Sequence, residues 1–289
     1  MPVTNTPLRY PGGKSQLIPF VIEVLRSNDL FYGEYAEPFA GGSGIALHLL
    51  LNNYVSKIYL NDIDPAINAF WRAVLRHSEE LCEKIASTPI TIEEWRHQRS
   101  IYLAPTGHSV VDRGFATLFL NRTNRSGIIK AGVIGGHGQN GNYLLDCRFN
   151  KLDLMQKIKR IAVLKSQIKL YRLDAIKFLQ QVIPKTSPST LVNLDPPYYE
   201  KGSELYTSFY KSEDHSNLAS AVKDTPRRWM VTYDNAPEIQ KLYSKFSLYC
   251  SSLNYSAQVK RVGTELMVLD PKLKVPNCLA DFKIEKIAA

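Results

Sequence analysis

Short apolar runs alternate with longer amphipathic segments along most of the chain, a pattern typical of α/β proteins. Apolar residues at helical spacing predict helices over Ile45–Leu51, Ala66–Leu75 and Glu213–Val222, the last of them capped by Ser212. The fold class predicted is α/β, with a doubly wound, mostly parallel sheet of seven strands. The seven runs that predict strands are Glu34–Glu37, Ser56–Leu60, Gln167–Leu173, Thr190–Leu194, Trp229–Tyr233, Phe246–Cys250 and Glu265–Leu269.

The alternation stops between residues 78 and 166. This stretch holds a helical pattern over Val110–Leu120, a glycine-rich segment from Gly127 to Gly141, and a second helical pattern over Asn150–Leu164. We therefore predict a split domain, residues 1–77 and 167–289, interrupted by a mostly helical insert over residues 78–166. Phe115, Leu118 and Phe119 should anchor the first helix in the core of the insert. The tail after Pro271 shows no pattern that predicts an element.

Positive charge is concentrated in the middle quarter of the chain. The chain has 36 Lys and Arg against 27 Asp and Glu, a net charge of +9, and residues 91–170 alone hold 13 basic and 5 acidic side chains. A concentrated basic region favours a polyphosphate partner, because each neutralised phosphate releases counterions. The alternative is a solvated basic face without a partner.

Composition narrows the class of protein further. No apolar run reaches the roughly 18–20 residues that a membrane helix needs, and the N-terminus lacks the layout of a secretory signal. The cysteines form no close pair, so we expect no metal site, no disulfide framework, and a cytoplasmic location. They are Cys82, Cys147, Cys250 and Cys278.

Two segments have the character of nucleotide-binding loops. The stretch Glu37-Pro38-Phe39-Ala40-Gly41-Gly42-Ser43-Gly44 follows a predicted strand and precedes a predicted helix, where glycines allow close approach of a ligand. The dinucleotide fingerprint fails at Leu47, and a P-loop ending in Gly13-Lys14-Ser15 fails at Leu8. Asp62, at the end of the next strand, is placed to bind ribose hydroxyls, whereas Asp62 or Asp64 could instead cap the following helix. A tight turn without a ligand remains the alternative for the glycine loop.

The most specific motif is Asp195-Pro196-Pro197-Tyr198, which directly follows an apolar strand. Two prolines stop the strand and donate no N–H, so the neighbouring carbonyls are left as acceptors. With the Asp195 carboxylate and the flat ring of Tyr198, they form a socket for a planar group that carries an amino substituent. The alternative is a plain turn at the end of a strand.

These motifs together resemble the Dam-like class of S-adenosylmethionine-dependent DNA adenine methyltransferases. Leu8-Arg9-Tyr10-Pro11-Gly12-Gly13-Lys14 resembles the N-terminal motif of the class, and the glycine loop, the segment Asn61-Asp62-Ile63 and the Asp195–Tyr198 motif resemble its cofactor loop, ribose-binding acid and catalytic motif. The order of the motifs also agrees. The resemblance implies a seven-stranded methyltransferase sheet and an inserted DNA-recognition domain.

The resemblance also assigns roles to residues. The expected catalytic residues are Asp195, Pro196, Pro197 and Tyr198. Asp174 would accept the amino group of the cofactor's adenine, although Ile176 stands where the class often has an aromatic residue. Lys14 and Tyr10 would lie near the methionine end of the cofactor or near Asp195. The expected cofactor-binding residues are Tyr10, Lys14, Glu37, Pro38, Phe39, Gly41, Gly42, Ser43, Asp62, Ile63, Asp174 and Asp195.

DNA recognition is assigned to the insert, because Arg favours guanine edges and Asn favours adenine edges. The expected DNA-binding residues are Arg122, Asn124, Arg125, Ser126 and Lys130, followed by a β-hairpin built from Gly127 to Gly138. The alternative for both arginines is contact with phosphate only.

The resemblance implies methylation of the 6-amino group of adenine in a specific double-stranded DNA sequence, with base flipping. Alternatives are methylation of cytosine or an RNA base, or a catalytically silent DNA-binding protein on the same fold. The expected partner is double-stranded DNA, without a membrane. A cognate restriction endonuclease is left open, and the expected state is a monomer or weak dimer.

Overall fold

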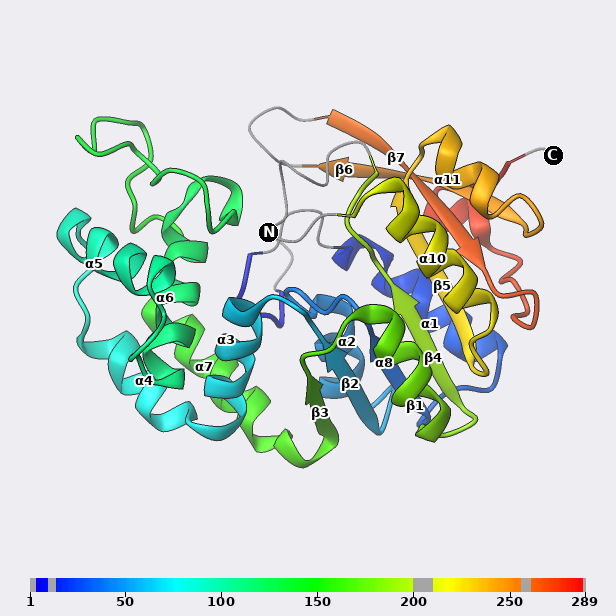
Figure 1. The fold of residues 1–289 in the computed structure, drawn as a ribbon, viewed down its shortest axis with the longest axis horizontal. Coiled ribbons are helices and arrows are strands. Elements are labelled where there is room, and N and C mark those ends of the chain that lie inside the picture. The colour runs from blue at the N-terminus through cyan, green and yellow to red at the C-terminus, as the bar shows by residue number, and fades with distance from the viewer. Residues whose placement is uncertain (1–3, 10–13, 200–209, 256–260, 288–289) are drawn as a thin grey trace. The chain divides into compact units, whose positions relative to one another are not determined.

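The alternating pattern gives an α/β fold built around a central sheet (Figure 1). The computed structural model describes residues 4–9, 14–199, 210–255 and 261–287. The chain divides into two compact units. The larger unit comprises Lys14–Ile63 and Leu173–Ala289, and the smaller unit comprises Met1–Gly13 and Asp64–Arg172.

The sheet of the described residues has eight strands instead of the expected seven, in the order β3-β2-β1-β4-β5-β7-β6-β8. The additional strand lies in the tail after Pro271, where three residues are too few to show a periodic pattern. The strands are β1 Glu34–Glu37, β2 Lys57–Asn61, β3 Ile168–Tyr171, β4 Thr190–Leu194, β5 Arg228–Asp234, β6 Leu248–Tyr255, β7 Arg261–Leu269 and β8 Ile284–Lys286.

The central strands of the sheet are parallel, and the strand order reverses direction between β1 and β4. β1 pairs in parallel with both β2 and β4, and β4 pairs in parallel with β5. The chain runs outward from β1 to β2 and, in the other direction, from β4 to β5. β7 pairs antiparallel with β5 and β6, and β8 pairs antiparallel with β6. Every residue of β1 and β4 is buried, as expected for strands covered on both faces.

Helices cover both faces of the sheet in the larger unit. α1 and α2 lie on one face, and α8 and α10 lie on the other (Figure 1). The expected cap at Ser212 is wrong: Lys211 is the N-cap in an extended conformation, and its N–H donates to the Asp214 carboxylate at 2.8 Å. The helices are α1 Ile18–Ser27, α2 Gly44–Leu51, α8 Ala175–Gln181, α10 Ser212–Lys223 and α11 Pro237–Leu242.

The smaller unit is a group of helices around a buried central one, α6. Phe115, Leu118 and Phe119 of this helix are fully buried, which confirms them as core residues. Gly114 allows α6 to approach α3 closely, since a Cβ there would lie 2.9 Å from the Cβ of Ala73. The helices are α3 Pro65–Arg76, α4 Ser78–Ser87, α5 Ile92–Leu103, α6 Val110–Thr123 and α7 Lys151–Val163.

The glycine-rich segment does not form the expected hairpin in the described residues 124–141. It consists of turns, with one isolated bridge between Asn124 and Val133. Gly127, Gly135 and Gly136 have positive φ angles, which turn the chain too often for two straight strands. No helix of the described part of the chain is long and apolar enough to cross a membrane.

Candidate active site

Two loops leave the sheet side by side where its winding reverses. β1 ends at Glu37 and β4 ends at Leu194, and the two strands are parallel neighbours in which Ala36 lies opposite Val192. The glycine loop after β1 and the Asp195–Tyr198 loop after β4 therefore start at the same edge. In open α/β sheets, ligands bind at this reversal point.

The glycine loop is fixed by the end of β2. The N–H of Gly41 donates to Oδ2 of Asp62 at 2.8 Å, and the N–H of Ala40 donates to the carbonyl of Asn61, also at 2.8 Å. Gly41 and Ser43 both have positive φ angles, and Ser43 is the N-cap of α2. Asp62 thus lies against the glycine loop, as expected of the two motifs.

Asp62 and Asp64 have different roles although one residue separates them. The carboxylate of Asp64 accepts from the N–H of Ala66 at 2.7 Å and caps α3, in the smaller unit. Of the two acids that could cap this helix, Asp64 is the residue that does so. Ile63, between them, is about half exposed.

Asn61 joins two loops of the larger unit. Its side chain accepts from the N–H of Leu173 at 2.8 Å and donates to the carbonyls of Leu173 and Pro38. This places Asp174, the next residue, beside the glycine loop. Oδ1 of Asp174 accepts from the N–H groups of Ile176 and Lys177 at 3.0 and 3.3 Å and caps α8.

Glu37 is buried at the start of the glycine loop. Its Oε1 accepts from the N–H of Ala46 in α2 at 3.2 Å. Burial, reinforced by the nearby charge of Asp195, raises the pKa of Glu37 to about 8, although the bond from Ala46 acts in the opposite direction. Glu37 is therefore largely neutral at pH 7, and no formal charge has to be stabilised beneath the loop.

The Asp195 carboxylate is held in place by the neighbouring strand and by Lys14. Its Oδ1 accepts from the hydroxyl of Thr232 on β5 at 3.0 Å and lies 3.5 Å from Nζ of Lys14. About a quarter of the Asp195 side chain is exposed, against 3% for Lys14. Burial raises the pKa of Asp195, and the Lys14 charge and the Thr232 hydrogen bond counteract it.

A buried network connects Lys14 to the Asp195–Tyr198 motif. Nζ of Lys14 lies 2.6 Å from the hydroxyl of Tyr198 and 2.7 Å from Oε2 of Glu265, and the Tyr198 hydroxyl donates to Oε1 of Glu265 at 2.7 Å. The expected position of Lys14 near Asp195 is confirmed, whereas Tyr10 lies outside the described residues. Glu265 was not predicted as a site residue, and its signal in the sequence is an acidic residue that begins the apolar run Glu265–Leu269, in the middle of β7.

Aromatic rings surround the end of β5. The ring of His215, from α10, is 5.3 Å from Tyr199, 5.4 Å from Tyr210 and 5.5 Å from Tyr233, and its Nδ1 lies 3.0 Å from the Tyr233 hydroxyl. Phe39, from the glycine loop, lies edge-on to Tyr210 at 5.8 Å. This cluster could not be predicted from the sequence, because its members come from four separate segments.

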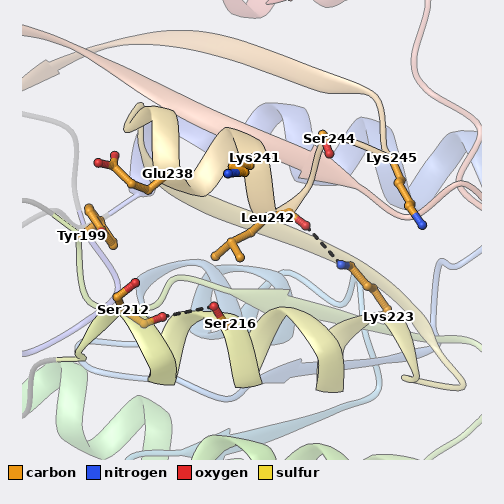
Figure 2. Close-up of a pocket in the computed structure, with 9 residues that line it drawn as sticks. All are labelled: Tyr199, Ser212, Ser216, Lys223, Glu238, Lys241, Leu242, Ser244 and Lys245. Atoms are coloured by element: carbon orange, nitrogen blue, oxygen red, sulfur yellow. Dashed lines mark hydrogen bonds between the residues drawn. The ribbon is translucent and has the colours of Figure 1, made fainter.

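A hollow of about 490 Å³ lies between α10 and α11 (Figure 2). Tyr199 is the lining residue nearest in sequence to the Asp195–Tyr198 motif. Lys223 crosses one end, where its Nζ donates to the carbonyl of Leu242 at 3.1 Å. The lining consists of Tyr199, Ser212, Ser216, Lys223, Glu238, Lys241, Leu242, Ser244 and Lys245, and includes neither the glycine loop nor Asp195.

Two of the expected DNA-binding residues point into the smaller unit. Arg122 is buried, and its guanidinium donates to the carbonyl of Pro7, with Nε at 2.6 Å. Burial, with the neighbouring charge of Arg9, lowers the pKa of Arg122 to about 10. The helix predicted over Val110–Leu120 continues to Thr123, so Arg122 lies within α6.

The side chain of Asn124 is likewise used inside the unit. It accepts from Nε1 of Trp95 at 2.7 Å and donates to the carbonyl of Ile129 at 2.7 Å. Arg125 and Lys130 are exposed, and Ser126 is half-buried with a positive φ angle. Only these last three of the five expected DNA-binding residues are accessible to a ligand in the described structure.

Comparison with known proteins identifies a family. The family model for D12 class N6 adenine-specific DNA methyltransferases matches residues 10–256. No curated protein sequence matches the chain.

Among the described residues, no group of three or more His, Cys, Asp and Glu side chains could hold a metal ion.

Several solved structures are similar over most of the chain but at low scores. A putative RNA methyltransferase, PH1948, from Pyrococcus horikoshii is 10% identical with a TM-score of 0.43, over 91% of this chain and 85% of that one. The rRNA methyltransferase aviRa from Streptomyces viridochromogenes is 13% identical with a TM-score of 0.36, over 87% and 83%. Scores this low carry no inference about substrate.

Arg122→Ala should lower the free energy of unfolding by about 1–3 kcal/mol, because the buried Pro7 carbonyl loses its donors. Urea denaturation measures the change. Arg125→Ala is the matched control, and this exposed arginine should change stability by no more than about 0.5 kcal/mol. Equal losses in the two variants would contradict the structural role of Arg122.

Glu37→Gln should flatten the dependence of stability on pH. Because the pKa of Glu37 is raised from 4.5 to about 8 on folding, the folded chain holds an extra proton between these values, and stability falls as pH rises through them. Gln still accepts from Ala46 but cannot ionise. Unfolding measured across this window should show a smaller decline in the variant, and an unchanged decline would mean that Glu37 ionises normally.

Proposed function

The chain belongs to the D12 class family of N6 adenine-specific DNA methyltransferases, and from this membership we propose that it methylates the 6-amino group of adenine in double-stranded DNA. The methyl donor in this proposal is S-adenosylmethionine. The observation that carries the proposal is the partly exposed Asp195 carboxylate, held by Thr232 and Lys14 at the reversal point of the sheet.

The residues of the larger unit fit this cofactor. The glycine loop has no side chains at Gly41 and Gly42 to obstruct a ligand, and α2 begins directly after it. Asp62 brings a carboxylate to the loop through its bond with Gly41, and a carboxylate in this place suits the hydroxyls of a ribose. Phe39 and Asp174 would complete the site. When bound, S-adenosylmethionine supplies an activated methyl group on a sulfonium.

Asp195 and the carbonyl of Pro196 orient the nucleophile in the proposed reaction. The lone pair of an adenine amino group is delocalised into the ring, so the nitrogen is a weak nucleophile. Two acceptors for its two hydrogens favour a pyramidal nitrogen whose lone pair faces the methyl group. Both bonds of the Tyr198 hydroxyl fix the plane of the ring that would stack on the base. The base must leave the duplex to reach this site, at a cost of a few kcal/mol.

The smaller unit would contact the DNA. Exposed Arg125 and Lys130 lie in the basic stretch of the chain and suit either base edges or phosphates. Arg122 and Asn124 would act indirectly, by holding the segment that presents them.

Asp195→Ala should reduce methyl transfer to adenine-containing duplexes about a hundredfold or more, because the amino group loses a preorganised acceptor. The rate of methyl transfer is measured with a tritiated methyl donor. Single-stranded DNA, adenine-free G·C duplexes and RNA serve as parallel substrates. Binding of the demethylated cofactor should be unchanged. Turnover above about a tenth of wild type would refute the role, and wild-type activity only on RNA or cytosine would refute the substrate.

Asp62→Ala should weaken binding of S-adenosylmethionine by about 1.5–3 kcal/mol, since a charge-assisted bond to the ribose is lost. Isothermal titration calorimetry measures the affinity. Asp64→Ala is the matched control, because it removes a helix cap two residues away and should lower the melting temperature without changing the affinity. Equal affinities in both variants would mean that Asp62 serves only the glycine loop.

A further inference from the structure

Glu265 is a buried carboxylate that the proposed reaction does not use. It lies on β7, opposite Asp234 of β5 and Ser251 of β6, and is 2% exposed. Both of its oxygens are engaged: Oε2 with Nζ of Lys14 and Oε1 with the hydroxyl of Tyr198, each at 2.7 Å. A buried anion in this position costs stability unless it is paired, so the pairing with Lys14 is a constraint on both side chains.

The ammonium of Lys14 is shared unequally between two carboxylates. Nζ lies 2.7 Å from Glu265 and 3.5 Å from Asp195, so the close ion pair is with Glu265. Both contacts described for the Asp195 carboxylate end at Oδ1, which leaves Oδ2 as the oxygen suited to a substrate amino group. A carboxylate in a close pair with an ammonium would direct its lone pairs to that cation and would accept weakly from a neutral amine.

We propose that Glu265 is a positioning residue that holds Lys14 back from Asp195 and so keeps the Asp195 carboxylate available to the amino group of the substrate. The identity of that substrate rests on the proposed function. The arrangement of Lys14 between the two carboxylates does not, because it is a property of the protein alone.

Among the described residues, the other ionisable groups that interact with Asp195 are negative or neutral. Glu37 and Tyr35 lie on β1, and Tyr233 lies on β5; each is influenced by the charge of Asp195. Lys14 is the cation that lowers the pKa of Asp195, while Glu265 and Asp195 repel each other. Loss of the Glu265 charge should therefore lower the pKa of Asp195 twice over, by removing a like charge and by releasing Lys14.

Glu265→Gln tests the proposal, since Gln keeps the shape of the side chain and removes its charge. Turnover should fall at least about tenfold near neutral pH, and the acid limb of the pH profile of kcat should move to lower pH. Affinity for the demethylated cofactor should be unchanged. Glu34→Gln is the matched control, because Glu34 is a strand carboxylate paired with Lys57 at 3.1 Å, at the other end of β1. It should leave turnover and the acid limb unchanged.

Titration of ¹³C-labelled Asp195 by NMR decides the proposal without substrate. The pKa of Asp195 should fall in Glu265→Gln. It should fall less in Glu265→Asp, which keeps a carboxylate on β7 and is the milder variant if the first fails to fold. An Asp195 pKa that stays constant or moves the other way would overturn the proposal. A wild-type protein that methylates no adenine would overturn the proposed function while leaving this titration interpretable.

Discussion

Lys14 places one positive charge between two carboxylates in a region that water hardly reaches. Its ammonium contacts Glu265, Tyr198 and Asp195, which belong to β7 and to the loop after β4. Removing a buried cation from such a group leaves anions without compensation, a change that commonly costs several kcal/mol. Segments far apart in the sequence therefore depend on the same buried charge, and the partly exposed Asp195 carboxylate is held by the buried side chains of Lys14 and Thr232.

The sheet supplies the geometry that makes this network possible. Because β1 and β4 are adjacent and parallel, the glycine loop and the Asp195–Tyr198 motif leave the same edge of the sheet. β5 brings Thr232 against Asp195, and antiparallel β7 returns Glu265 to the same end, opposite Asp234. An all-parallel sheet would bring the start of β7 to the opposite edge. The antiparallel strand is thus part of the site as well as of the fold.

The sequence predicted the central strands and the local motifs better than it predicted which side chains meet in the folded protein. β1 and β4 have the predicted bounds, because buried parallel strands form short runs limited by turn residues. β8 was missed because a three-residue strand has no period, and the hairpin was wrong because glycines serve turns as readily as strands. The glycine loop, Asp62 and the Asp195–Tyr198 motif could be recognised, because each lies in a short stretch of sequence next to a predicted strand. Glu265 and the rings around His215 could not, because only the folded sheet brings them to the site.

Arg122 shows why charge in a sequence is an uncertain guide to a binding surface. A guanidinium close to asparagines at a helix end fits DNA recognition, yet here it satisfies a buried backbone carbonyl of the N-terminal segment. Asn121 does the same for Arg9, accepting from its N–H at 2.7 Å and donating to its carbonyl at 2.7 Å. A segment with no partner in a helix or sheet must find donors and acceptors elsewhere, and side chains at the end of α6 provide them. The charge of Arg122 thus maintains the structure of the smaller unit, and fewer basic side chains are exposed than their count in the sequence suggests.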